Sequence, residues 1–424
     1  MSASFKKAWV VDTSMGYGHQ RAAFALRSIA QGQRVVHADQ YQGIPHSDKA
    51  VWETSRRLYE TMSRFKKIPV LGDIVFGIFD KFQEIQEFYP KMQAIEHPTL
   101  QLRQVYGLME KKQWGKHLIE RLNENPLPLV ATFPAIAFMA EYWGYEGPVW
   151  LVVTDTDISR AWAPLKAAQS EIGYFVPTSV ARERLLRYGV PGRNIFHTGF
   201  PLPPDLLRHA KEDLRRRIQA LDPAGEYQKS YADLVKHYLG AVPAKRKQVP
   251  VVTFAVGGAG VQEDIAQEVL EGLSPLLRRR KIRLNLVAGM HKGVTKHFHE
   301  LAAKHRLSSS VNIVYRNTGH EYFWEFARVL RKTDILWTKP SELVFYAALG
   351  IPLLLAPPVG SQEDHNQEYI VSLGAGIKQL DPKLAAEWVQ DMINKGSFAE
   401  AAMQGFVEME KRGTENISKI ICAS

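Results

Sequence analysis

Short apolar runs rich in β-branched residues alternate along the chain with longer stretches in which apolar residues recur at helical spacing. This alternation is typical of parallel sheets wrapped by helices, so the pattern predicts an α/β fold. The predicted strands fall into two sets, one in each half of the chain: residues 8–12, 34–38, 129–132, 149–154 and 172–176, then residues 251–256, 283–288, 312–315, 334–338 and 352–356.

A charged stretch without a strand pattern separates the two halves. It runs over residues 211–247 and ends in the basic run Lys245-Arg246-Lys247. We expect one or two surface helices here, at the junction of two domains. The length of 424 residues supports this division, because a single core rarely grows so large.

One segment of the first half breaks the alternation. Over residues 51–65 apolar side chains recur at helical spacing among several arginines, and residues 68–79 are apolar but interrupted by Pro69 and Gly72. Cationic and apolar residues side by side suit an interfacial element that meets anionic lipid. A helical excursion packed on its own domain is the alternative, and the pattern leaves both open.

Composition narrows the class of protein. An apolar share of 45% with 23% charged residues is that of an ordinary soluble protein, and one cysteine, Cys422, excludes an internal disulfide and fits a reducing cytoplasm. No apolar stretch suggests a signal peptide or a bilayer span, so we expect a cytoplasmic protein, compatible with peripheral attachment to the inner face of the membrane. The formal net charge of +10 favours anionic partners. Without a basic motif interleaved with aromatic residues, we expect no nucleic acid among them.

A glycine-rich turn follows the first predicted strand. Gly16, Tyr17, Gly18 and His19 stand there, directly before a helical pattern. Glycine lets the backbone approach a ligand closely, and the start of a helix favours negative charge. A dinucleotide fingerprint would have a third glycine where Arg21 stands, so the turn does not indicate a dehydrogenase. Ligands of open α/β sheets bind beyond the carboxyl ends of the strands, which makes His19 a candidate base.

Two acids and a tryptophan follow the fourth predicted strand. Asp155 and Asp157 come directly after it, and Trp162 stands a few residues later. In a doubly wound sheet these acids lie on the same rim as His19, where a carboxylate can orient the imidazole or accept a proton from a hydroxyl group. Helix capping by Asp155 or Asp157 is the alternative reading.

A second glycine-rich loop opens the second half. Gly257, Gly258 and Gly260 follow the strand at 251–256, and the backbone N–H groups of such a loop can face a diphosphate. The loop lacks the Lys-Ser/Thr ending of a P-loop, which disfavours phosphoryl transfer.

Polar side chains gather after the last two predicted strands. Lys339 and Glu342 follow the strand at 334–338, and a turn stiffened by proline and glycine leads to Gln362, Glu363 and Asn366. Amides and carboxylates bind vicinal hydroxyl groups by paired hydrogen bonds. This density of such side chains predicts a site for a sugar or a ribose.

The order of these motifs resembles that of one enzyme group. The shared elements are Gly-x-Gly-His after the first strand, Thr-Asp after the fourth, the segments 173–178 and 197–201, the Gly-Gly loop, Thr-Lys-Pro at 338–340 and Gly-x-Gln-Glu-x-x-Asn at 360–366. Together they are similar to the GT-B glycosyltransferases that include monogalactosyldiacylglycerol synthase, processive diacylglycerol glucosyltransferases and the peptidoglycan lipid N-acetylglucosaminyltransferase. The similarity spans residues 10–373 except for 211–247.

The resemblance implies a domain plan. In the GT-B fold two Rossmann-like, doubly wound α/β domains face each other across a cleft. Residues 1–205 would form the acceptor-binding domain and residues 249–385 the nucleotide-sugar-binding domain. Residues 206–248 would be a charged helical linker, and residues 386–424 would be C-terminal helices that pack back toward the N-terminal domain.

The resemblance also implies a reaction. It is an inverting transfer from a UDP-sugar to a hydroxyl acceptor, with no metal ion and no cofactor besides the donor substrate. Segment 51–79 occupies the place where lipid-acting members carry their membrane-binding acceptor region, so a lipid acceptor and an anionic membrane surface are the expected partners. The implied site residues are His19 and Asp155 for catalysis; Gly16, Tyr17, Gly18 and Trp162 for the acceptor; and Gly257, Gly258, Gly260, Lys339, Glu342, Gln362, Glu363 and Asn366 for the donor.

The chain departs from the pattern of these enzymes at three positions. Ser341 replaces the glycine that usually follows Lys-Pro, and Phe345 stands five residues before Gly350, where members have the glutamate that holds the ribose. Glu342 is therefore the candidate for the ribose from a different turn. Tyr17 replaces a small residue and would narrow the acceptor entrance. A UDP-sugar 2-epimerase and a non-catalytic protein that binds a nucleotide-sugar or a lipid are the alternative functions.

Overall fold

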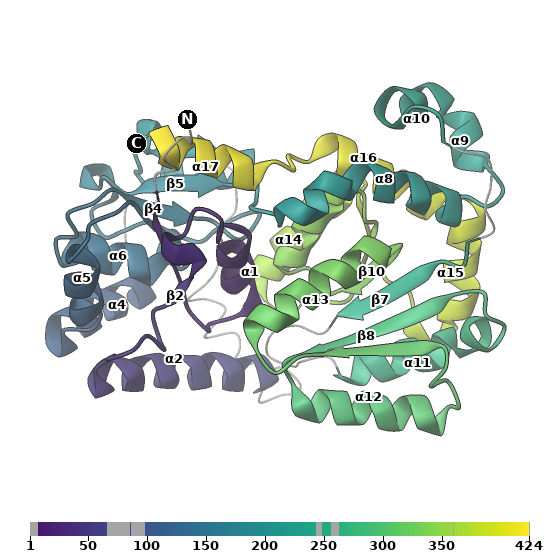
Figure 1. Ribbon diagram of the computed structural model, residues 1–424, viewed down its shortest axis with the longest axis horizontal. Helices are drawn as coiled ribbons and strands as arrows, with labels where there is room; N and C mark the ends of the chain where they lie inside the picture. The colour runs from purple at the N-terminus through teal and green to yellow at the C-terminus, as the bar shows by residue number, and fades with distance from the viewer. Residues whose placement is uncertain are drawn as a thin grey trace. The chain divides into compact units, whose positions relative to one another are not determined.

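The computed structural model describes residues 7–65, 85, 98–242, 248–255, 263–358 and 360–423, with the backbone alone at 58–65 and 263–264. The chain forms two compact units. The first comprises residues 1–203, 359–365 and 412–424, and the second comprises residues 204–358 and 366–411. Each unit has its own six-stranded sheet (Figure 1), and every strand pairing in both sheets is parallel.

The sheet of the first unit has the order β2-β1-β3-β4-β5-β6. Because β1 lies between β2 and β3, the direction of winding changes between β1 and β3. Open α/β sheets bind their ligands beyond the carboxyl ends of the strands at such a switch point. The strands are β1 (Trp9–Asp12), β2 (Val36–His37), β3 (Leu129–Ala131), β4 (Val149–Val152), β5 (Gly173–Val176) and β6 (Ile195–His197).

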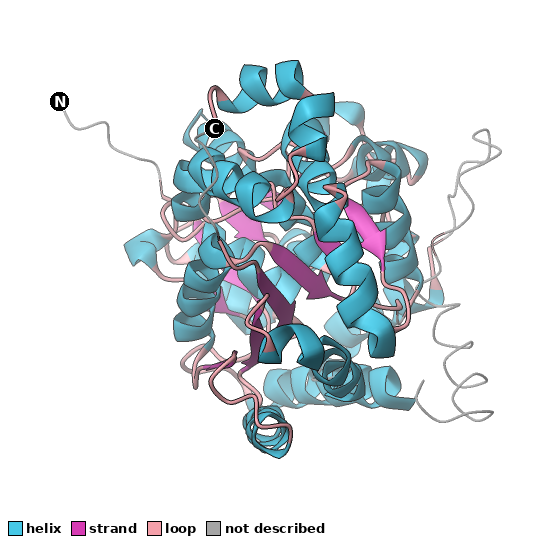
Figure 2. Cartoon of the chain, turned by 90° about the vertical axis from the view of Figure 1, so that its right-hand side faces the viewer, coloured by secondary structure: helices cyan, strands magenta, loops and turns pink. Residues whose placement is uncertain are grey.

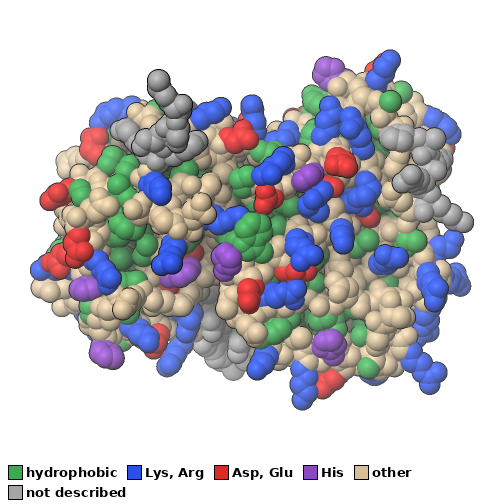
Figure 3. Space-filling view, viewed as in Figure 1, with side chains coloured by type: hydrophobic (Ala, Val, Ile, Leu, Met, Phe, Trp, Pro, Cys, Tyr) green, Lys and Arg blue, Asp and Glu red, His purple; other side chains and the backbone are tan. Residues whose placement is uncertain are grey.

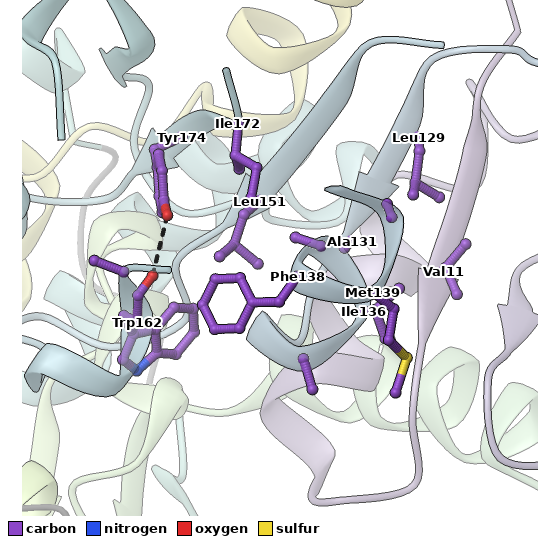
Figure 4. Close-up of a cluster of buried hydrophobic side chains, with 14 of the residues drawn as sticks. Val11, Leu129, Ala131, Ile136, Phe138, Met139, Leu151, Trp162, Ile172 and Tyr174 are labelled. Carbon is purple, nitrogen blue, oxygen red and sulfur yellow. Dashed lines mark hydrogen bonds between the residues drawn. The ribbon is translucent and has the colours of Figure 1, made fainter. Parts of the chain in front are cut away.

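The core of the first unit lies between the sheet and α6 (Pro134–Tyr142). Figure 4 shows strand residues such as Val11, Leu151 and Tyr174 with Phe138 and other side chains of α6. Helix α6 is apolar almost all round, as expected of a helix buried on most sides, and a proline begins it. The other helices of this unit are α1 (Tyr17–Ala25), α2 (His46–Phe65), α4 (Leu100–Lys112), α5 (Lys116–Asn123), α7 (Ser179–Arg187) and α17 (Gly413–Ala423), with short 3₁₀ turns at Gln31–Gln33, Arg160–Trp162, Ala167–Gln169 and Gly192–Asn194.

The C-terminal helix α17 belongs to the first unit, whereas α15 and α16 before it belong to the second. The hydroxyl group of Thr414 donates to the carbonyl oxygen of Leu202 at 2.7 Å, and the Asn416 amide donates to that of Thr198 at 2.9 Å. Gly413 has no side chain for a steric reason: a Cβ there would lie 2.2 Å from the carbonyl oxygen of Phe200.

The sheet of the second unit has the order β12-β11-β10-β7-β8-β9. Figure 2 shows strands enclosed between helices, as expected of sheets buried on both faces. The strands are β7 (Val251–Ala255), β8 (Arg283–Gly289), β9 (Val311–Tyr315), β10 (Ile335–Thr338), β11 (Leu353–Leu355) and β12 (Gly376–Lys378). The helices are α8 (Pro204–Leu221), α9 (Glu226–Ser230), α10 (Ala232–Leu239), α11 (Glu263–Arg278), α12 (Lys292–Lys304), α13 (Gly319–Lys332), α15 (Ala385–Asn394) and α16 (Ser397–Glu408), with 3₁₀ helices η5 (Glu342–Leu349) and η6 (Pro382–Leu384).

Helix α8, in the segment with the charged sequence, is part of the second unit. Its Arg217 is fully buried and donates to the carbonyl oxygens of Thr333 at 2.8 Å, Leu349 at 2.9 Å and Leu330 at 3.0 Å. Burial lowers the pKa of this guanidinium to about 10. The carbonyl partners compensate for the lost hydration of the charge.

The two sheets confirm the predicted α/β class and the two doubly wound halves. Every predicted strand is present, although β2 covers only part of 34–38. The prediction missed β6 and β12, which are edge strands of three residues each. Each has one buried residue among its three, which is too few to show the alternation of apolar and polar positions that marks a strand. Within the described ranges, no helix combines the length and the apolar character that a membrane span requires.

Candidate active site

Helix α1 starts at the switch point of the first sheet. Its N-cap, Gly16, has φ 127° and ψ 155°, a backbone conformation that L side chains rarely adopt. A Cβ built at Gly16 would meet no atom within 4 Å. Glycine is therefore required here by the backbone angle and not by a close neighbour. The strained turn allows the chain to leave β1 and enter α1 within a few residues.

The first turns of α1 place His19 against the end of β3. Nδ1 of His19 lies 2.5 Å from the carbonyl oxygen of Thr132, the residue after β3. The imidazole also meets the ring of Phe133 edge to face, with centroids 5.0 Å apart, and lies 6.2 Å from the ring of Trp162. The imidazole of His19 and the indole of Trp162 are therefore neighbours.

The contact with Thr132 determines the tautomer of His19. A carbonyl oxygen only accepts hydrogen bonds, so Nδ1 must carry the proton and donate it. In the neutral imidazole the lone pair then lies on Nε2. His19 is half-buried, which keeps part of the ring accessible. The geometry therefore prepares Nε2 as a proton acceptor.

The two acids after β4 have different environments. Asp157 is buried and accepts from Arg184 at 2.8 Å and 2.9 Å in a two-pronged ion pair, and its Oδ1 also accepts the N–H of Ile158. Asp157 is thus a structural residue. Asp155 is half-buried and stands three positions after the end of β4. Because β1, β3 and β4 are parallel neighbours, Asp155 and the turn before His19 lie at the same edge of the sheet.

The aromatic residues predicted for the acceptor are mostly buried. Tyr17 is 7% exposed, and the guanidinium of Arg21 lies over its ring at 5.3 Å from the centroid. Trp162 is 4% exposed and belongs to the core cluster, and its carbonyl oxygen accepts from the hydroxyl group of Tyr174 at 3.2 Å. In this arrangement Trp162 supports the His19 ring from the core. Gly16, at the N-cap of α1, and Gly18, in its first turn, are half-buried.

A polar cluster that the sequence did not reveal braces the turn before α1. Nδ1 of His37 lies 2.5 Å from Oδ1 of Asp12, and the two residues are paired across β1 and β2. The carboxylate of Asp39 accepts the N–H of Ser14 at 3.3 Å, and the Gln40 amide donates to the Ser14 hydroxyl at 2.6 Å. The hydrogen bond with Asp12 raises the pKa of His37, and burial raises the pKa of Asp12.

The predicted donor residues Lys339, Glu342 and Asn366 lie in the second unit. Lys339 is half-buried and follows β10, and Glu342 is buried in the first turn of η5. Asn366 is fully buried and its amide donates to the carbonyl oxygen of Pro340 at 3.1 Å. This bond ties the Lys339-Pro340-Ser341 turn to α14 (Ser361–Ser372), so both follow the carboxyl ends of β10 and β11. Phe345 is buried within η5.

The remaining predictions on the donor side concern the start of α14 and the glycine loop. Gln362 and Glu363 are half-buried in the first turn of α14, where Gly360 accepts the N–H of Glu363 at 2.8 Å. Gly257, Gly258 and Gly260 lie outside the described residues, as do residues 66–79 of the predicted interfacial segment. Among described side chains, no group of three or more His, Cys, Asp or Glu is arranged to hold a metal ion.

The chain is similar to known glycosyltransferases. No family model matches it. A processive diacylglycerol beta-glucosyltransferase from Bacillus subtilis (strain 168) is 23% identical over 380 residues, which cover 88% of this chain and 83% of that protein. This similarity confirms the resemblance that the order of motifs predicted.

The chain also has similarity to solved structures. MurG from Acinetobacter baumannii has a TM-score of 0.47 at 12% identity, with 99% of this chain and 100% of that chain covered. A putative UDP-N-acetylglucosamine 2-epimerase from Listeria monocytogenes has a TM-score of 0.49 at 12% identity, with 97% and 94% covered.

Proposed function

We propose that this chain, a glycosyltransferase by its sequence similarity, moves a sugar from a UDP-sugar to a hydroxyl group of a lipid, with inversion and without a metal ion. The observation that carries the proposal is the hydrogen bond from Nδ1 of His19 to the carbonyl oxygen of Thr132. It leaves Nε2 as the basic atom of the ring, at the edge of the sheet where ligands of such folds bind.

The proposed reaction is a direct displacement at the anomeric carbon of the donor. Nε2 of His19 accepts the proton of the acceptor hydroxyl as its oxygen attacks, and the bond from the anomeric carbon to the diphosphate breaks. Attack on the face opposite the leaving group inverts the anomeric centre. Asp155, on the same sheet edge, is the alternative base or the group that stabilises the imidazolium.

The donor side needs groups that stabilise the diphosphate as it leaves. Lys339 follows β10, and helix α14 begins beside Gln362 and Glu363. The positive end of a helix and a lysine ammonium both favour phosphate oxygens. We assign the diphosphate to these groups together with Gly257, Gly258 and Gly260, and the sugar and ribose hydroxyls to Gln362, Glu363 and Glu342. Asn366 holds the turn that carries Lys339.

The proposed acceptor is a lipid with a diacylglycerol portion. The Bacillus subtilis relative is named for glucosyl transfer to diacylglycerol, and the similarity covers most of both chains. The sequence of residues 51–79 has the mixture of basic and apolar residues that suits an interface with anionic lipid. We infer a peripheral enzyme on the cytoplasmic face of a membrane, with Gly16, Tyr17 and Gly18 at the entrance for the acceptor.

The proposal is tested first by donor binding. A panel of UDP-, GDP- and TDP-sugars is added to the full chain and the thermal unfolding midpoint is measured, because a ligand of the folded state raises it. We expect UDP-sugars alone to stabilise the wild type, and Gln362→Ala to lose most of this stabilisation. Stabilisation by GDP-sugars only would refute the donor assignment.

Release of UDP is then measured with and without diacylglycerol in vesicles. We expect UDP to be released faster when the vesicles contain diacylglycerol. Conversion of the UDP-sugar into an epimer without any acceptor would instead establish a 2-epimerase. Donor binding with no turnover over a broad panel of lipid, sugar and peptide acceptors would establish a non-catalytic binding protein.

A further inference from the structure

Two neighbouring loops of the second unit carry a concentrated positive charge. One lies between α11 and β8 and the other between α12 and β9. Residues 278–283 and 304–306 contain no Asp or Glu, and all their Lys and Arg side chains are exposed. We call these side chains the basic rim: Arg278, Arg279, Arg280, Lys281, Arg283, Lys304 and Arg306.

The two loops form one patch. The guanidinium of Arg278 donates to the carbonyl oxygen of His305 at 3.5 Å, and the hydroxyl group of Ser310 donates to that of Leu277 at 3.4 Å. The strands that follow the loops are parallel neighbours, with Leu284 opposite Val311. The charges of both loops therefore act on the same partner.

The acids around the patch are already paired with other groups. Glu271 of α11 faces Nε2 of His305 at 3.4 Å, and the buried Asp334 accepts from Arg216 of α8 and from the N–H of Val251. Within the described ranges, no ion pair joins an Asp or Glu to a side chain of the basic rim. The positive charge of the rim is thus not neutralised by its own unit.

The basic rim is separate from the candidate donor site. It precedes β8 and β9, so it lies at the amino edge of the second sheet, whereas Lys339 and α14 follow the carboxyl ends of β10 and β11. Figure 3 shows Lys and Arg side chains along the right-hand margin, beyond the beginning of the arrow for β8 in Figure 1. A partner bound to the rim leaves the donor loops open.

We propose that the basic rim docks on an anionic lipid surface. Each Lys or Arg near such a surface strengthens attachment severalfold, and this attraction acts over about a Debye length, roughly 10 Å at moderate salt. The two loops have no Phe, Tyr or Trp on which single-stranded nucleic acid could stack. The choice of lipid among polyanions rests on the proposed lipid acceptor, which requires the enzyme to remain at a membrane.

The test is vesicle binding by the full chain without any sugar donor. Cosedimentation is measured with phosphatidylcholine vesicles that contain increasing fractions of phosphatidylglycerol. The triple variant R279E/K281E/K304E reverses exposed charges on both loops and avoids Arg280 and Arg306, whose φ values are positive. A matched variant, K229E/K236E/K383E, makes the same change in net charge on exposed lysines of the same unit outside the rim.

We expect the wild type to bind in proportion to the anionic lipid, and R279E/K281E/K304E to bind at least about tenfold more weakly. The matched variant should stay within about threefold of the wild type, and all three proteins should unfold at similar urea concentrations. Equal loss in both variants, or no loss in the rim variant, would overturn the proposal. Capture of the rim by an RNA or DNA duplex in preference to anionic vesicles would also overturn it.

The outcome is separable from that of the proposed function. Sugar transfer to an acceptor dispersed in detergent does not require a vesicle, so the rim variant should retain it within about twofold. If the chain transfers sugar in detergent but the rim variant binds vesicles as well as the wild type, the rim proposal alone fails. If vesicle binding depends on the rim but no acceptor receives sugar, the proposed function alone fails.

Discussion

Nδ1 of His19 lies 2.5 Å from the carbonyl oxygen of Thr132, and this contact fixes which nitrogen of the ring is basic. A peptide carbonyl offers no proton, so the imidazole must donate from Nδ1 and keep its lone pair on Nε2. The contact joins the helix after β1 to the loop after β3, the two neighbours at the switch point of the first sheet.

Replacement of His19 should remove the proposed base. We expect His19→Ala to lower kcat for sugar transfer by about 10²–10⁴, the usual range for a general base, and to change the KM for the UDP-sugar little. Steady-state UDP release measures both. His209→Ala is the matched control, since that histidine lies on α8 with a surface ion pair to Glu212 and should remain within about twofold of the wild type. An unchanged kcat, with only the KM for the UDP-sugar altered, would contradict the role of a base.

The turn before His19 should depend on glycine at position 16. Its φ of 127° strains any L side chain, so Gly16→Ala should destabilise the protein by about 1–3 kcal/mol, although no atom stands where the methyl group would go. Urea denaturation measures the change. Gly293→Ala is the control, because Gly293 lies within α12 without a positive φ or a close neighbour, and alanine there should be neutral or stabilising. Equal effects of both substitutions would contradict this reading of the turn.

The buried ion pair of Asp157 and Arg184 should show strong coupling. Arg184 is 0% exposed and Asp157 4% exposed. Arg184→Met leaves a buried carboxylate without its guanidinium and should cost about 3–5 kcal/mol of unfolding free energy. The double variant D157L/R184M removes both charges and should recover most of this loss. A double variant as unstable as the sum of the single ones would show that the two side chains act independently.

The pair of His37 and Asp12 should make stability depend on pH. The hydrogen bond with Asp12 raises the pKa of His37 in the folded state, so its stabilising contribution is complete below the unfolded pKa of about 6.5 and is lost as pH rises through the folded pKa. Burial raises the pKa of Asp12, so its contribution to stability also falls as the pH rises through that pKa. Because the His37 side chain is 45% exposed, the effect should be modest.

The variant His37→Gln isolates this contribution. The difference in urea stability between wild type and variant should be larger at pH 5.5 than at pH 8.5. A difference that is constant or that grows with pH would contradict the assignment of the charge to this pair.

The sequence predicted the strands and the two-sheet plan because buried parallel strands are continuous apolar runs. It did not predict β6 and β12, whose three residues at a sheet edge bury too little to mark a pattern. The glycine-rich turn pointed to His19, but not to Thr132, because a backbone carbonyl leaves no trace in the residue type. The contact of Asp12 with His37 depends on the register of β1 and β2, which the sequence does not encode locally.

The sequence could not show which of the two acids after β4 has a structural role. Asp155 and Asp157 are equivalent in the sequence, two positions apart on one loop. They differ only in the folded protein. Helix α7 packs against this loop and brings Arg184 to Asp157, whereas Asp155 remains half-buried. The burial of Trp162 is a tertiary property of the same kind.

The central claim is that His19 acts as the base in sugar transfer to a lipid. The most direct measurement is the amount of labelled glycolipid formed from a labelled UDP-sugar and diacylglycerol vesicles by the wild type and by His19→Ala. The account predicts that labelled lipid accumulates with the wild type and falls by about 10²–10⁴ in rate with the variant, while donor binding persists. Equal rates of labelled lipid formation by both proteins would contradict it.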